Sequence, residues 1–264
     1  MKSSAAIPFT KAEACGNDFL IIDSAHRGAN PSGLSRRLCD RHLGAGADGV
    51  EWVNVEPDGR VVARLINSDG SEAEISGNGT RCVAAWAIDH RGGTEVRVLT
   101  GAGEKKCTLT QKSHHRYELR MEMGVVEILG EKTLSTPFGE VKGWVISLGN
   151  PHFVQFVNEF PVNWQERAAA VEGHPNFPHR TNVELVKVLG PSRIEFRIFE
   201  RGAGETQSSG TGSCASAVAA ISCADVWSPV QVSAPGGIQI VHWDKGHLLL
   251  EGPARLVCRG EFLV

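Results

Sequence analysis

Long apolar runs are missing from this sequence, and no segment approaches the ~18 apolar residues that would span a membrane. An excess of one charge is also missing, because 27 Lys and Arg against 30 Asp and Glu leave a net charge of −3. We therefore expect no nucleic acid as a partner. Lys11 and Glu13 interrupt the N-terminal segment before a signal-peptide core could form. The sequence thus predicts a cytoplasmic protein that does not bind a membrane.

Cysteine pairs with metal-binding spacing are absent as well. The chain has seven cysteines and no Cys-x-x-Cys pair, so we expect neither a disulfide framework nor a zinc knuckle. His114 and His115 are adjacent and would face apart on a strand, while His174 and His179 lack a partner at ligand spacing. No metal site is predicted, and the cysteines are expected to be small buried apolar residues.

Glycine, by contrast, is abundant. It makes up 30 of 264 residues, about 11%, against a usual ~7%. Apolar residues are 41% and charged residues 22%, a balance that is typical of a globular protein and excludes a disordered chain. The length is that of one large domain or two of ordinary size.

The chain repeats itself. Residues 64–79 align without a gap on residues 197–212, a shift of 133 that matches Ser76 with Ser209. The same shift carries Gly16-Asn17 onto Gly149-Asn150. A shift of 134 lays Gly103 on Gly237. Two copies of one unit that face each other would form one cleft, where ligand sites tend to lie.

In both copies a strand, residues 61–66 and 193–199, leads through a glycine-rich turn into a helix of small residues, 80–89 and 213–224. Two outer helices are expected at 32–42 and 163–171. Further strands are expected at 19–23, 95–99, 106–111, 117–122, 145–147, 153–157, 183–188, 230–233, 238–242 and 247–251.

These elements predict an α+β fold of two pseudo-symmetric domains, each a curled sheet around a central helix. We place the N-terminal domain at 1–121, joined by a C-terminal strand at 253–264, and the C-terminal domain at 122–252.

The repeated Ser-Gly-x-Gly motif is expected to stand where each central helix begins. Its glycines let backbone N–H groups approach a ligand, and a helix N-terminus favours an anion such as a carboxylate. A phosphate loop is disfavoured, since Thr80 and Ser213 stand where its lysine would be. One reactive position in each half suits stereoinversion at an amino-acid α-carbon, in which one group removes a proton and another delivers one to the opposite face. A purely structural turn is the alternative.

At these residues the sequence resembles the diaminopimelate epimerase family of cofactor-independent amino-acid racemases. The matching segments, in family order, are 16–19 (GNDF), 40–49 (DRHLGAGADG), 67–72 (NSDGSE), 77–82 (GNGTRC), 149–152 (GNPH), 200–206 (ERGAGET), 210–212 (GTG) and 235–237 (PGG). The resemblance implies two α/β barrels, each with a central helix, in an enzyme without a cofactor. It also implies a small amino-acid substrate and a place in lysine or peptidoglycan precursor biosynthesis.

The resemblance assigns roles by position. The two bases fall at Ser76 and Ser209, and His152 and Glu200 assist proton transfer. The substrate-binding positions are Asn17, Asn67, Gly77, Asn78, Asn150, Asn182, Arg201, Gly210 and Thr211. Without the resemblance, the asparagines would be read as turn residues. A homodimer is left open by the sequence.

Both base positions depart from the family pattern, which has cysteine where this chain has serine. A thiol has an ordinary pKa near 8.5, and a helix N-terminus lowers it, whereas an alcohol is a far weaker acid. Three interpretations remain: an epimerase inactivated by serine, a racemase or dehydratase with other chemistry, and an amino-acid-binding homologue without catalysis. Cys82 and Cys214 are not expected to replace the bases, because they lie a turn or more along each helix.

Overall fold

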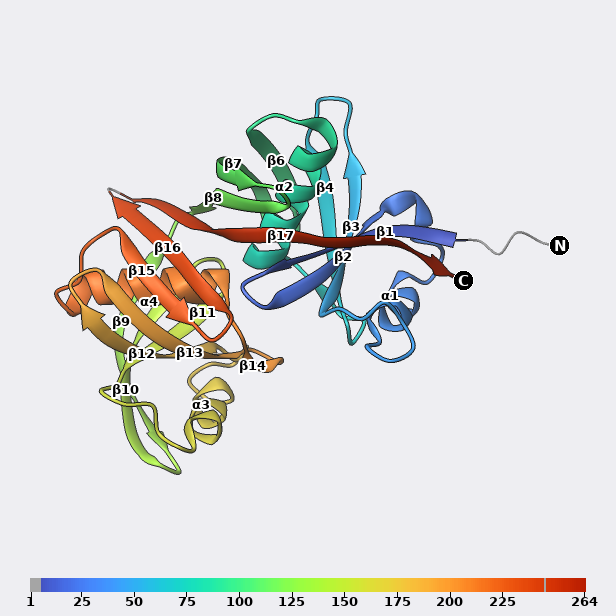
Figure 1. Ribbon diagram of the computed structural model, residues 1–264. Helices are drawn as coiled ribbons and strands as arrows, with labels where there is room; N and C mark the ends of the chain where they lie inside the picture. Colours follow the sequence, from blue (N-terminus) through green and yellow to red (C-terminus); the bar gives the residue numbers. More distant parts are fainter. Residues whose placement is uncertain (1–5, 245) are drawn as a thin grey trace. The chain divides into compact units, whose positions relative to one another are not determined.

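The computed structural model describes residues 6–244 and 246–264. Its contacts divide the chain into two compact units (Figure 1). One runs to Met121 and includes Gly252–Val264, and the other is Glu122–Glu251. Across the described residues, no helix has the length and apolar character needed to cross a membrane.

The N-terminal unit is a closed barrel of eight strands, with one helix inside and one outside. Helix α2 (Gly77–Arg91) packs against six of the strands, while α1 (Pro31–Cys39) covers β3 and β4. In order of pairing the strands are β1 (Ala6–Ala14), β2 (Asn17–Asp23), β3 (Gly49–Val55), β4 (Val61–Asn67), β6 (Glu95–Thr100), β7 (Gly103–Ser113), β8 (Arg116–Gly124) and β17 (His247–Leu263), which pairs again with β1. The short elements are η1 (Ser24–His26) and β5 (Glu72–Ala73).

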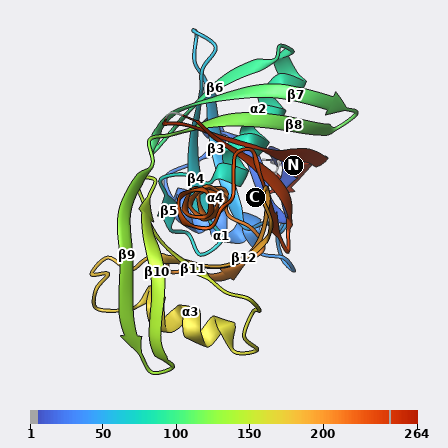
Figure 2. The same cartoon turned by 90° about the vertical axis from the view of Figure 1, so that its left-hand side faces the viewer.

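The C-terminal unit is built in the same way around α4 (Gly210–Cys223). Figure 2 looks along α4, which packs against the strands of its own unit. In order of pairing they are β9 (Glu127–Thr136), β10 (Gly139–Ser147), β11 (Pro151–Phe156), β12 (Asn182–Gly190), β13 (Arg193–Glu200), β15 (Val230–Ala234), β16 (Gly237–Asp244) and the first residues of β17. Helix α3 (Trp164–Glu172) packs against β12 and β13, and β14 (Gly204–Thr206) pairs with β13.

Small side chains allow each central helix to be enclosed. Ala84 and Ala85 of α2, and Ala217 and Ala219 of α4, are completely buried. An alanine-rich helix brings its axis close to the surrounding strands, and alanine has the highest intrinsic helix propensity. The outer helices bury larger side chains instead, such as Trp164 of α3 against the aromatic and aliphatic side chains of the sheet.

The elements repeat at the shift seen in the sequence. Ala6 and Gly139, Pro31 and Trp164, and Gly77 and Gly210 begin equivalent elements 133 residues apart. Each outer helix connects two parallel strands: β2 with β3 around α1, and β11 with β12 around α3. The prediction of an α+β fold with two pseudo-symmetric halves around central helices is confirmed.

Several predicted element bounds were wrong. The helix expected at 32–42 ends at Cys39, because the carboxylate of Asp40 accepts the N–H groups of His42 and Leu43 and turns the chain. Both central helices begin three residues earlier than predicted, because a serine side chain caps each one. The strands expected at 247–251 and 253–264 form the single strand β17.

Five strands were not predicted: β1, β3 and β9, and the short strands β5 and β14. Charged residues interrupt the apolar pattern in the first two, with Lys11 and Glu13 in β1 and Glu51 in β3. In β9 nearly all side chains are exposed, so the strand has no apolar face from which to recognise it.

A larger side chain inside a central helix should disturb the packing. We expect Ala217→Leu to lower the free energy of unfolding by about 1–3 kcal/mol, since the enclosed site has no room for three more carbon atoms. Urea unfolding followed by circular dichroism measures this. The matched control is Ala169→Leu on the exposed side of α3, where we expect a change within about 0.5 kcal/mol. If both substitutions lower the free energy of unfolding by the same amount, the tight packing around α4 is contradicted.

Candidate active site

Ser76 caps the central helix of the N-terminal unit. It lies in extended backbone directly before α2, and its Oγ accepts the N–H of Gly79 at 3.1 Å. Gly77 and Asn78 follow as the first two residues of the helix, and both are buried. The first N–H groups of a helix have no partner within the helix, and the helix dipole places partial positive charge there. This end of α2 is therefore suited to a carboxylate.

Ser209 occupies the equivalent place in the C-terminal unit. Its Oγ accepts the N–H of Gly212 at 3.3 Å and lies 3.4 Å from Oγ1 of Thr211. Ser209 is only 7% exposed, and Gly210 is buried at the first position of α4. The strand–turn–helix setting expected from the sequence is thus present in both units.

Steric crowding explains why the last residue of each Ser-Gly-x-Gly motif is glycine. A Cβ on Gly79 would collide with the carboxyl of Glu51, and one on Gly212 would lie 2.6 Å from Cδ1 of Ile198 and 3.0 Å from Oε1 of Glu184. Glu51 and Glu184 are equivalent residues of β3 and β12, and both are buried. Each central helix therefore begins directly against a buried carboxyl group from a neighbouring strand, and only glycine leaves room for it.

In the C-terminal unit this carboxyl group holds a histidine. Nδ1 of His152 lies 2.6 Å from Oε1 of Glu184, and neither side chain is exposed. Nε2 of His152 lies 3.2 Å from Oδ1 of Asn150. Burial raises the pKa of Glu184, and the charge of His152 and its hydrogen bond to Glu184 oppose the rise. His152 is thus fixed at both ring nitrogens.

Glu200 lies near Ser209 at the end of β13. The hydroxyl of Thr206 donates to Oε1 of Glu200 at 2.6 Å. Burial raises the pKa of Glu200, while hydrogen bonds from Thr206 and Ser209 and the charge of His152 oppose the rise. A carboxyl group, an imidazole and a hydroxyl thus gather at the start of α4. That is a set of groups able to pass a proton.

Asn182 and Arg201 are joined by a hydrogen bond. Nδ2 of Asn182 donates to the carbonyl of Pro151 at 3.0 Å, and its Oδ1 accepts the N–H of Arg201 at 3.0 Å. The nitrogen and the oxygen of the buried amide therefore both form hydrogen bonds within the protein. Through these bonds Asn182 fixes the turn that carries Arg201. The Arg201 side chain is exposed. Its guanidinium forms no ion pair with any residue that the structure describes.

Two other asparagines of the N-terminal unit are held apart from Ser76. Asn67 donates from Nδ2 to Oγ of Ser71 at 3.1 Å, within the turn after β4. Asn17 donates from Nδ2 to Oδ2 of Asp48 at 2.5 Å. No hydrogen bond between described residues joins either side chain to Ser76, and Asn67 bonds within its own turn.

Sequence reasoning missed four side chains near these residues: Glu51, Glu184, Asp48 and Arg81. The guanidinium of Arg81 is completely buried and donates to the carbonyls of Gly77 and Pro253 and to Oδ1 of Asn78. A charged residue within an otherwise apolar strand was the only signal in the sequence for Glu51, whereas Arg81 also lies in the segment 77–82 that matches the family.

Cys82 and Cys214 are buried inside their helices with no exposed surface. Burial raises the pKa of the Cys82 thiol well above its ordinary value. A thiol with a raised pKa inside the helix packing is not suited to act as a base.

Glu51 should make stability depend on pH. Burial raises the pKa of Glu51 from 4.5 to about 8, so the folded state favours the protonated form while the unfolded chain ionises. The free energy of unfolding should therefore fall as pH rises from about 4.5 to about 8. The Glu51→Gln variant should escape this loss and be up to about 5 kcal/mol more stable than the parent chain above pH 8.

Urea unfolding of both chains at pH 5 and pH 8.5 measures this difference. The control is Glu140→Gln, at an exposed position of β10. Its free energy of unfolding should differ from that of the parent chain by the same amount at both pH values. If the free energies of unfolding of Glu51→Gln and the parent chain differ by the same amount at both pH values, Glu51 is already ionised in the folded protein.

Comparison with known proteins identifies the family. A sequence model of diaminopimelate epimerase matches residues 9–129 and 144–257. A protein named diaminopimelate epimerase from Pelotomaculum thermopropionicum is 38% identical over 275 residues, 96% of this chain and 98% of the relative. The chain belongs to the diaminopimelate epimerase family. A relative of the same name from Microcystis aeruginosa is 36% identical over 97% of this chain and 99% of its own length.

Solved structures share the fold at low sequence identity. An epimerase of Pseudomonas aeruginosa, described as predicted, superposes with a TM-score of 0.75 at 15% identity, covering 98% of this chain and 99% of the other. A hydroxyproline epimerase from Agrobacterium vitis gives 0.73 at 14% identity, covering 97% and 90%. The chain therefore shares its fold with these two epimerases, and its family membership makes it a homologue of diaminopimelate epimerases.

Proposed function

We propose that the chain binds diaminopimelate with Ser76 and Ser209 at the positions of the two bases. The observation that carries this proposal is the serine cap at equivalent helix N-termini, in a chain of the diaminopimelate epimerase family. The reaction interconverts LL- and meso-diaminopimelate by removing the α-proton and returning one to the opposite face. A helix N-terminus that binds the α-carboxylate stabilises the negative charge that spreads onto this carboxylate when the α-proton leaves.

The two half-sites differ in their supporting groups. Ser209 has Glu200 and the His152–Glu184 pair close by, whereas Ser76 has Glu51 next to the same helix turn. His152 and Glu200 would assist proton transfer at the C-terminal half. The residues that would hold the substrate are those at the family's binding positions: Asn17, Asn67, Gly77, Asn78, Asn150, Asn182, Arg201, Gly210 and Thr211.

Serine at both base positions makes the chain a poor epimerase. In the family that the chain resembles these positions are cysteine, whose thiolate forms near neutral pH, whereas an alcohol keeps its proton. We therefore propose an inactivated epimerase. A dehydratase or racemase with one base, and a homologue that only binds an amino acid, remain the alternatives. Biosynthesis of a lysine precursor would place the protein in the cytoplasm. The proposed function requires no nucleic acid as a partner, and it is compatible with a monomer or a homodimer.

Restoring the thiols tests the proposal. The chain and the double variant Ser76→Cys, Ser209→Cys are incubated with LL-diaminopimelate in D₂O, and α-deuterium is followed by NMR. We expect no exchange by the serine chain and measurable exchange by the double variant, because only a thiolate is a sufficient base. The matched control is Ser71→Cys with Ser208→Cys, which adds two thiols nearby in sequence but at neither helix cap, and it should remain inactive.

Each other outcome has a clear meaning. Exchange by the serine chain itself would contradict inactivation and favour chemistry by Glu200, His152 or Glu51. A correctly folded double variant without exchange would contradict diaminopimelate as the substrate. Calorimetric binding without turnover by the double variant would favour the binding homologue.

A further inference from the structure

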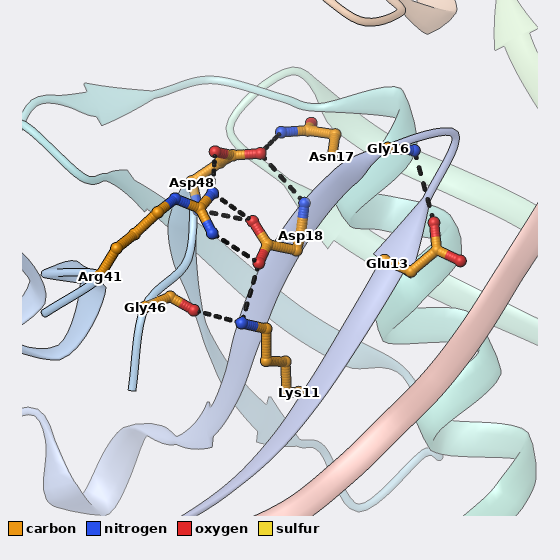
Figure 3. A network of polar contacts seen from close by, with 8 residues as sticks. All are labelled: Lys11, Glu13, Gly16, Asn17, Asp18, Arg41, Gly46 and Asp48. Carbon is orange, nitrogen blue, oxygen red and sulfur yellow. Dashed lines mark hydrogen bonds and ion pairs between the residues drawn. The ribbon is translucent and has the colours of Figure 1, made fainter. Parts of the chain in front are cut away.

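A charged network surrounds Asn17 at the start of β2. Figure 3 shows the side chains that take part, and the amide nitrogen of Asn17 points to Asp48. Oδ2 of Asp48 accepts this Nδ2–H at 2.5 Å and the backbone N–H of Asp18 at 3.1 Å. Asn17 directly follows a two-residue turn, Cys15-Gly16, in which both φ angles are positive. This tight turn fixes the backbone from which Asn17 extends.

Two cations fix the carboxylates of this network. Nη2 of Arg41 lies 2.8 Å from Oδ1 of Asp18 and 2.7 Å from Oδ1 of Asp48. Nζ of Lys11 lies 3.0 Å from Oδ2 of Asp18 and donates to the carbonyl of Gly46 at 2.6 Å. Burial alone would raise the pKa of Asp18, but hydrogen bonds from Arg41 and Lys11 lower it overall. Arg41 thus holds the two carboxylates in one arrangement.

This arrangement decides which end of the Asn17 amide is exposed to a ligand. An ionised carboxylate only accepts hydrogen bonds, so the amide must turn its NH₂ group toward Asp48. The amide oxygen of Asn17 then points away from the network, as Figure 3 shows. An oxygen fixed in this way can accept hydrogen bonds and cannot donate them.

The equivalent asparagine of the C-terminal unit has different partners. Oδ1 of Asn150 lies 3.2 Å from Nε2 of His152, whose Nδ1 lies 2.6 Å from Oε1 of Glu184. Nδ2 of Asn150 lies 3.5 Å from Oγ1 of Thr211. An imidazole and a hydroxyl therefore stand beside Asn150, whereas a carboxylate stands beside Asn17.

The difference follows from residues that the repeat does not conserve. At the shift of 133 residues, Thr181 stands in place of Asp48, and Phe19 in place of His152. The supporting group of each asparagine thus has no counterpart in the other unit. Sequence alone aligns Asn17 with Asn150, and only the contacts show that their amides have different partners.

We propose that Asp48, held by Arg41, is a positioning residue that makes the Asn17 amide oxygen the acceptor for an ammonium group of the substrate. This inference rests on the proposed function, since it assumes an amino-acid ligand. An ammonium group carries three donors and no acceptor, whereas a carboxylate carries acceptors only. The fixed oxygen of Asn17 therefore attracts the first and repels the second.

The test compares two ligands with the same carbon chain. The dissociation constants of meso-diaminopimelate and of pimelate, which lacks both amino groups, are measured by calorimetry, with pimelate followed by displacement of diaminopimelate. We expect Asp48→Ala to weaken diaminopimelate binding about tenfold and to leave pimelate binding nearly unchanged, because a free amide can rotate and offer either end. Arg41→Gln should act in the same direction with a smaller effect. Asp48→Asn should retain part of the preference, since its oxygen can still accept from Asn17.

A matched control separates positioning from folding. Asp58→Ala removes a carboxylate that also forms an ion pair with an arginine, Arg60, at 2.7 Å in a turn of the same unit. It should change neither affinity. Equal weakening of both ligands by Asp48→Ala, or no change for diaminopimelate, would overturn the role of Asp48. Failure of the parent chain to bind diaminopimelate at all would instead overturn the proposed function, and this inference with it.

Discussion

The first turn of each central helix is the constraint on which the rest of the structure depends. A helix enclosed by strands must satisfy its first N–H groups, because buried backbone donors without partners are costly. Ser76 and Ser209 each satisfy one of them, and the glycine three residues later admits a buried glutamate from the adjacent strand. The small residues that follow allow the barrel strands to pack closely around the helix. The repeated Ser-Gly-x-Gly motif is thus a folding requirement as well as a candidate site for an anion.

The repeat supplies two similar helix starts, and substitutions around them make the two different. Glu184 has His152 as its partner, whereas its equivalent Glu51 faces a region where phenylalanine replaces the histidine. Burial therefore leaves Glu51 with a raised pKa and no ion pair with a described residue. In the same way, Asp48 and Arg41 support Asn17 in one unit, and His152 supports Asn150 in the other.

Much of the fold could be predicted because its signals are local. The alternating strands, the small-residue helices and the repeat at 133 residues are all visible in the sequence, and the structure has them. The strands β1 and β3 could not be predicted, since Lys11, Glu13 and Glu51 break the apolar pattern. Lys11 is tolerated because it bonds to Asp18, a partner that the strand pattern does not reveal. The candidate site was predictable mainly through resemblance to a family, and its supporting residues were not.

The sequence by itself determined the repeat, the α+β class and the equivalent positions of Ser76 and Ser209. These properties depend on residue identity and on spacing along the chain. The tertiary structure decided that Glu51 and Glu184 lie against the helix starts, that Arg41 links Asp18 to Asp48, and that the equivalent asparagines have different partners. Each of these depends on which distant side chain supplies a donor or an acceptor, and that is settled only when strands far apart in the chain are paired.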